Sequence, residues 1–75
     1  METSELIKAI RSQLGLSQEA FADAIHVVFS TVNRWENNKS TPNSMAQALI
    51  VDYCEKNNVD KEFIAAIKRI NRKQC

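Results

Sequence analysis

The chain has 75 residues, of which 10 are Lys or Arg and 9 are Asp or Glu, for a formal net charge of +1. A domain of this size buries roughly 60% of the surface that its unfolded chain exposes, so one thin core must suffice. One glycine and one proline exclude collagen-like and turn-dense all-β architectures. We therefore expect residues 1–75 to form a single domain.

Several function classes find no support in the sequence. No apolar run approaches the roughly 20 residues that a membrane span needs, and residues 1–5 lack the basic and apolar pattern of a secretory signal. Cys54 and Cys75 are too few for a disulfide framework and have no zinc-ligand spacing. We expect a cytoplasmic protein with no metal, no cofactor, no membrane and no small-molecule substrate.

The first predicted helix covers residues 3–14. Leu6, Ile10 and Leu14 recur four residues apart and form one apolar helical face. Gly15 follows, where a helix can end in a left-handed turn without steric cost.

Two short helices are predicted next, separated by residues 26–28. The first begins after Ser17, a favourable N-cap, and runs for about two turns. Its inward residues are Ala20, Phe21, Ala24 and Ile25. The second runs from about Phe29 to Asn37, with Val32 and Trp35 pointing inward.

Two longer helices complete the prediction. A polar loop ends at Pro42, and a helix from Ser44 to Lys56 begins with a possible capping box between Ser44 and Gln47. Its expected inward residues are Met45, Ala46, Leu49, Ile50 and Tyr53. The last helix runs from Asp60 to about Arg72. The predicted fold class is all-α, a compact bundle of five helices.

The stretch from Leu16 to Asn37 carries the functional signal. It predicts a short helix, a three-residue turn and a second short helix held at a fixed angle. Such a pair can place one helix in the major groove of DNA, which is about 12 Å wide, while the other bridges the backbone.

Two separated pieces of this region, Leu14–Glu19 and Ser30–Lys39 followed by Pro42, make the chain resemble the lambda repressor-like (Cro and cI, or XRE) helix-turn-helix family. The resemblance spans about Leu6 to Tyr53. It implies a five-helix bundle with the motif on helices two and three. It also implies sequence-specific binding of double-stranded DNA by a small transcriptional regulator of a prokaryote or phage.

The resemblance also implies roles for individual residues. Base contacts are implied for Val28, Phe29, Ser30, Asn33 and Arg34, with Asn33 the weaker candidate. Arg34 could bond O6 and N7 of a guanine through its forked guanidinium. Phosphate contacts are implied for Gln18, Asn37 and Lys39. Arg11 and Glu36 match an internal ion pair. A homodimer is the expected bound form, with contacts from helix five and the C-terminal tail.

Some positions depart from the family pattern. His26 and Asn38 stand where glycine is frequent, so we expect both to adopt a left-handed backbone. Val28 replaces the usual Ser or Thr N-cap, at an expected cost of about 0.5–2 kcal/mol. Thr41 replaces a frequent basic residue and removes a phosphate anchor.

A second interpretation stays open from the sequence. The near-neutral charge and the apolar run Val27–Phe29 also suit a protein-interaction or antitoxin-like module with a degenerate helix-turn-helix. An enzyme is not expected, because the chain has one histidine and no glycine-rich phosphate loop.

Overall fold

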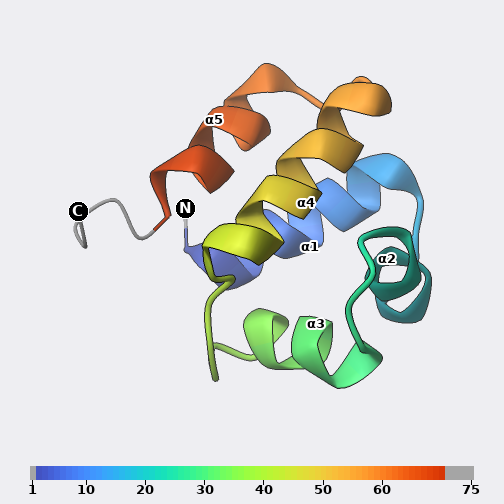
Figure 1. The fold of residues 1–75 in the computed structure, drawn as a ribbon, viewed down its shortest axis with the longest axis vertical. Coiled ribbons are helices and arrows are strands. Elements are labelled where there is room, and N and C mark those ends of the chain that lie inside the picture. Colours follow the sequence, from blue (N-terminus) through green and yellow to red (C-terminus); the bar gives the residue numbers. More distant parts are fainter. Residues whose placement is uncertain (1, 71–75) are drawn as a thin grey trace.

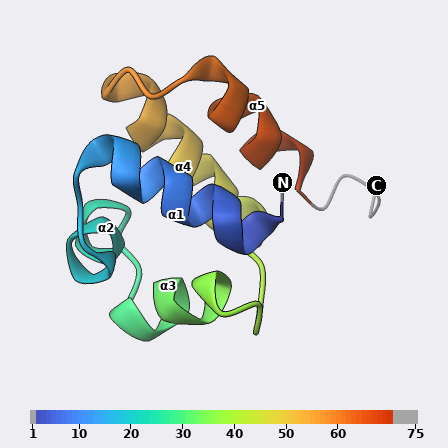
Figure 2. The same ribbon diagram turned by 180° about the vertical axis from the view of Figure 1, so that it is seen from behind.

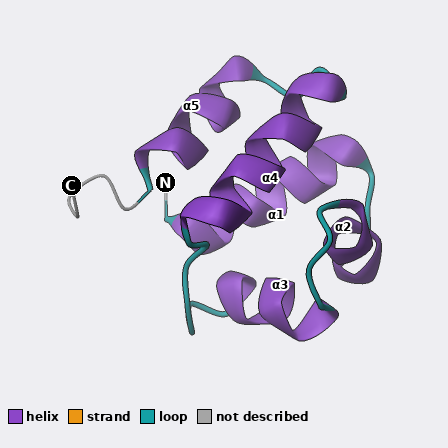
Figure 3. Ribbon diagram, in the orientation of Figure 1, coloured by secondary structure: helices purple, strands orange, loops and turns teal. Residues whose placement is uncertain are grey.

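The computed structural model describes residues 2–70 and places five α-helices in them (Figure 1). They are α1 (Thr3–Leu14), α2 (Gln18–Ala24), α3 (Phe29–Glu36), α4 (Ser44–Lys56) and α5 (Lys61–Arg69). Coloured by secondary structure, these residues show only helices and loops, which confirms the all-α prediction (Figure 3). None of these helices is long and apolar enough to cross a membrane. The last helix is shorter than predicted: α5 ends at Arg69, and its C-cap Ile70 has an extended backbone, so the helix does not continue to Arg72. Cys75 lies outside the described residues.

The end of α1 and the start of α2 are set by local capping residues that the sequence predicts. Gly15 ends α1 with a φ of 71°, and its backbone N–H donates to the carbonyls of Arg11 and Ser12. Ser17 then caps α2, because its hydroxyl accepts a 3.1 Å hydrogen bond from the backbone N–H of Ala20. Both caps satisfy backbone groups that a helix end leaves unpaired.

The start of α4 differs from the prediction. Asn43, not Ser44, is the N-cap, and its side-chain oxygen accepts a 2.9 Å hydrogen bond from the N–H of Ala46. Gln47 bonds outside any capping box, with its amide donating to the carbonyl of Pro42 at 2.9 Å. Serine and asparagine are similarly favourable N-caps, so residue type alone does not select between Asn43 and Ser44.

The turns around α3 take the expected left-handed conformations. His26 has a φ of 63° and Asn38 a φ of 60°. Val28 is the N-cap of α3 and supplies no side-chain hydrogen bond, and the helix ends at Glu36 with Asn37 as its C-cap. The predicted helix, which ended at about Asn37, is therefore one residue longer than the observed one.

Apolar side chains from all five helices form one core. Its buried members are Leu6, Ile7, Ile10, Phe21, Ala22, Ile25, Val32, Trp35, Ala46, Ile50, Cys54, Val59, Ile64 and Ile67. Met45 was expected to point inward, but 75% of its surface is exposed. It is the second residue of α4, and Ala46 takes the inward position one residue later.

The helices pair in a way that leaves α3 at one end of the molecule. α2 packs on α3, α4 packs on α5, and α1 contacts both α3 and α5. In Figures 1 and 2, which view the molecule from opposite sides, α3 lies at the lower end and the α4–α5 pair at the upper. The side of α3 that faces away from α1 and α2 is therefore at the surface.

Candidate nucleic-acid interface

The α3 helix has one buried and one exposed side. Val32 and Trp35 are buried, at 0% and 3% exposure, and fix the helix to the core. Ser30 and Arg34 are exposed, and neither side chain has a hydrogen-bond or ion-pair partner among the described residues. Phe29 is 48% exposed. The side chains that the sequence analysis assigned to base contacts therefore lie mainly on the outer side.

An ion pair anchors the C-terminal end of α3 to α1. Arg11 Nε donates to Glu36 Oε2 at 2.7 Å, and Arg11 Nη2 donates to Glu36 Oε1 at 2.9 Å. The third arm, Nη1, donates to the carbonyl of Leu16 at 2.9 Å in the loop between α1 and α2. This two-pronged geometry is the strong form of an Arg–carboxylate contact. The pair implied by the family resemblance is thus present.

The Glu36 side chain is only 2% exposed, whereas that of Arg11 is 23% exposed. Burial by itself raises the pKa of the Glu36 carboxyl. Hydrogen bonds from Arg11 and Gln18, together with the charges of Arg11 and Lys8, outweigh it, so the pKa lies below its usual value of 4.5. The hydrogen bond to Glu36 raises the pKa of Arg11 in turn. Glu36 is therefore an anion at neutral pH, and its charge is neutralised inside the motif.

Three side-chain amides extend from this ion pair across α2 and α3. Gln18 Nε2 donates to Glu36 Oε1 at 3.0 Å, and Asn33 Nδ2 donates to Gln18 Oε1 at 3.1 Å. Asn37 Nδ2 then donates to Asn33 Oδ1 at 3.2 Å and to the Asn33 carbonyl at 2.7 Å. We call Gln18, Asn33 and Asn37 the amide chain. It joins the start of α2 to the end of α3.

The amide chain was not anticipated from the sequence. The sequence predicts phosphate contacts for Gln18 and Asn37 and a base contact for Asn33. In the structure the three side chains form hydrogen bonds with one another. Only the four-residue spacing of Asn33 and Asn37, which places them on one helix face, could have signalled part of it. Lys39, the third residue assigned to phosphate, is exposed in the loop after α3.

A hollow of about 270 Å³ lies between α3 and the loop that leads to α4. Its lining residues are Val27, Thr31, Arg34, Trp35, Ser40, Thr41, Asn43 and Ala46. Several of these lining residues carry hydroxyl or amide groups, so the hollow adds polar side chains beside Arg34.

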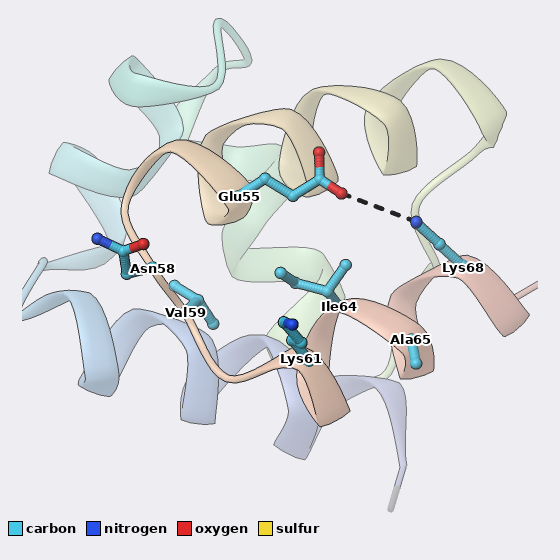
Figure 4. Close-up of a pocket in the computed structure, with 7 residues that line it drawn as sticks. All are labelled: Glu55, Asn58, Val59, Lys61, Ile64, Ala65 and Lys68. Atoms are coloured by element: carbon cyan, nitrogen blue, oxygen red, sulfur yellow. Dashed lines mark ion pairs between the residues drawn. The ribbon is translucent and has the colours of Figure 1, made fainter.

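A second hollow, of about 350 Å³, lies between α4 and α5, at the end of the molecule opposite α3 (Figures 1 and 4). Val59, Ile64 and Ala65 line it, and Lys68 Nζ lies 3.8 Å from Glu55 Oε2 at its rim. Within residues 2–70, no group of three or more His, Cys, Asp and Glu side chains could hold a metal ion.

A family model described as helix-turn-helix matches residues 7–56, two thirds of the 75-residue chain. No curated protein and no solved structure matches the chain. The matched segment contains α2, α3 and the Arg11–Glu36 pair, so the sequence match and the geometry describe the same unit. The chain therefore belongs to the lambda repressor-like helix-turn-helix family, a family of DNA-binding transcription regulators.

Proposed function

We propose that this protein binds double-stranded DNA in a sequence-specific manner, with α3 as the recognition helix in the major groove. The observation that carries the proposal is the two-sided character of α3. One side is fixed by Val32, Trp35 and the Glu36 ion pair, and the other side has no protein partner within the described residues. An eight-residue helix is about 12 Å long, which suits a groove about 12 Å wide.

Base recognition is assigned to the exposed residues of α3. Arg34 has five donors and no internal partner among the described residues, so it can bond N7 and O6 of one guanine at no internal cost. Ser30 can donate or accept. Phe29 and Val28, which are 48% and 65% exposed, can pack on the methyl group of thymine. Asn33 is half-buried and takes part in the amide chain, so it is the least accessible member of the set.

Backbone contacts are assigned to Gln18 and Lys39, with Asn37 requiring a rearrangement. Gln18 uses one N–H on Glu36 and keeps the other. Lys39 is exposed and adds a positive charge. The side-chain nitrogen of Asn37 already bonds two oxygens of Asn33, so it must release one of them to reach a phosphate.

The charge of the motif predicts a modest electrostatic contribution. Because Glu36 is buried and paired with Arg11, the exposed charges of residues 16–45 are two basic side chains and two acidic ones. Few phosphate contacts give a shallow dependence of affinity on salt. We propose that the protein acts as a homodimer, because two half-sites about one helical turn apart compensate for weak single-domain binding.

In vitro selection of duplexes by the purified protein, repeated over a salt series, tests the proposal. It yields the preferred sequence, its symmetry and the number of phosphate contacts. Arg34→Ala should relax the preference at one base pair and leave the melting temperature almost unchanged, because the Arg34 side chain has no hydrogen-bond or ion-pair partner among the described residues. An equal loss on every sequence would assign Arg34 to a phosphate instead.

A protein-interaction module is the second candidate. The exposed apolar side chains Val28, Phe29 and Met45 favour it. It is preferred if the wild-type protein selects no duplex even in dilute buffer.

A further inference from the structure

Asn33 sits in the middle of the amide chain, and we infer that it is a positioning residue for Gln18 and not a reader of bases. This inference rests on the proposed function, since it concerns how the same surface meets DNA. It starts from the observation that both polar atoms of the Asn33 side chain are engaged. Nδ2 donates to Gln18 at 3.1 Å, and Oδ1 accepts from Asn37 at 3.2 Å.

The orientation of all three amides follows from the groups at the two ends of the chain. At one end the Glu36 carboxylate can only accept, so the end of the Gln18 amide that lies 3.0 Å away must be its nitrogen. At the other end the Asn33 carbonyl can only accept, so the Asn37 atom 2.7 Å away must also be nitrogen. Both requirements give the same direction, with each amide donating toward Glu36. Flipping one amide would place two oxygens or two nitrogens face to face.

This direction determines what Gln18 offers to DNA. Its oxygen accepts from Asn33 and one of its N–H groups donates to Glu36, which leaves the second N–H without a partner among the described residues. A free side-chain N–H donor on Gln18 suits a phosphate oxygen, which can only accept. Without Asn33, the Gln18 side chain keeps its bond to Glu36 but can rotate about it.

The same bonds make Asn33 a poor base reader. A paired contact with adenine needs the N–H and the oxygen of the amide aligned on the base edge, whereas the bonds to Gln18 and Asn37 hold the partly buried Asn33 amide between α2 and the end of α3. Ser30 and Arg34 have none in the described part of the chain, so they reach bases without breaking internal hydrogen bonds.

A double-mutant cycle between Asn33→Ala and Gln18→Ala tests the inference on the duplex selected by the wild-type protein. Each single change should weaken binding by about 3- to 10-fold, which corresponds to one hydrogen bond. Asn33→Ala should weaken all duplexes equally, and it should cause less than about a 2-fold further loss in the Gln18→Ala background. Ser30→Ala is the matched control, because Ser30 does not bond Gln18 and its effect should add to that of Gln18→Ala.

Two results overturn the inference while the proposed function stands. One is that Asn33→Ala costs the same in both backgrounds. The other is that it relaxes the preference at one base pair, as a base reader would. Melting temperatures of all variants, measured in parallel, exclude loss of fold as the cause of weaker binding.

A measurement without DNA decides the positioning role independently. In the free protein, ¹⁵N relaxation of the Gln18 side-chain amide should report a restricted group, and Asn33→Ala should lower its order parameter while Ser30→Ala does not. An unchanged order parameter in Asn33→Ala overturns the inference. A wild-type protein that binds no duplex refutes the proposed function instead, and the relaxation data then still decide whether Asn33 holds Gln18.

Discussion

Removing the Glu36 carboxylate should destabilise the domain more than any change on the outer face of α3. The side chain is 2% exposed and accepts two hydrogen bonds from Arg11 and one from Gln18. Glu36→Ala leaves a cation facing the cavity, and breaking a buried pair in this way costs about 3–5 kcal/mol. Because Arg11 is 23% exposed and can turn toward water, we expect about 2–4 kcal/mol.

Such a loss is large for a domain of this size. A chain of 75 residues has a free energy of unfolding of about 4–11 kcal/mol. A loss of about 2–4 kcal/mol lowers the melting temperature by roughly 10–25 °C at this length. Urea unfolding followed by circular dichroism at neutral pH measures the difference directly.

The double change Arg11→Met with Glu36→Leu provides the control. It removes both charges and fills the space with apolar atoms, so it should recover about half of the loss or more. If Glu36→Ala costs less than about 1 kcal/mol, the ion pair is effectively solvated, and the view that it fixes α3 against α1 is wrong.

Three further predictions concern stability. Val28→Ser should raise the free energy of unfolding by about 1 kcal/mol, because Val28 is the N-cap of α3 and supplies no side-chain acceptor; a lower melting temperature would contradict this. Since the pKa of Glu36 is lowered by folding, the unfolded chain binds the proton more readily, so this stabilisation is complete above about pH 4.5 and is lost as the pH falls further. Glu36→Gln should lack this acid-dependent component in urea titrations at several pH values. Burial raises the pKa of Cys54 from 9.0 to about 11, with a smaller effect from Glu55. Stability should therefore fall by up to about 2–3 kcal/mol between pH 9 and 11, and Cys54→Ala should remove that part of the slope.

The positions of the helices depend mainly on interactions between residues close in the sequence, which is why the sequence predicts them. In α1 the spacing of Leu6, Ile10 and Leu14, followed by a glycine that accepts a left-handed backbone, sets both the helix and its end. The left-handed turns at His26 and Asn38 were likewise expected by comparison with the family pattern. Periodicity, capping and turn chemistry act over a few residues, so they can be read without the fold.

The details at helix starts were less predictable. Asn43 and Ser44 are both good caps, and the bond to Ala46 shows that the first is used. Met45 lies at the surface, whereas the next residue, Ala46, is buried. Pro42, just before the cap, is fully buried, and which residues are buried is a property of the whole domain.

What the sequence alone determined is the family, the five helices and the residues on the outer face of α3, because motif spacing and helical period encode them directly. What only the tertiary structure decided is which of those polar side chains are already engaged. The Gln18 side chain on α2 bonds Asn33 and Glu36 on α3. These partners are 15 or more residues from Gln18 in the sequence, and the contact with Glu36 is 3.0 Å long. A hydrogen bond tolerates a variation of only a few tenths of an ångström in the distance between donor and acceptor. Between segments far apart in the sequence, the packing of the helices sets that distance.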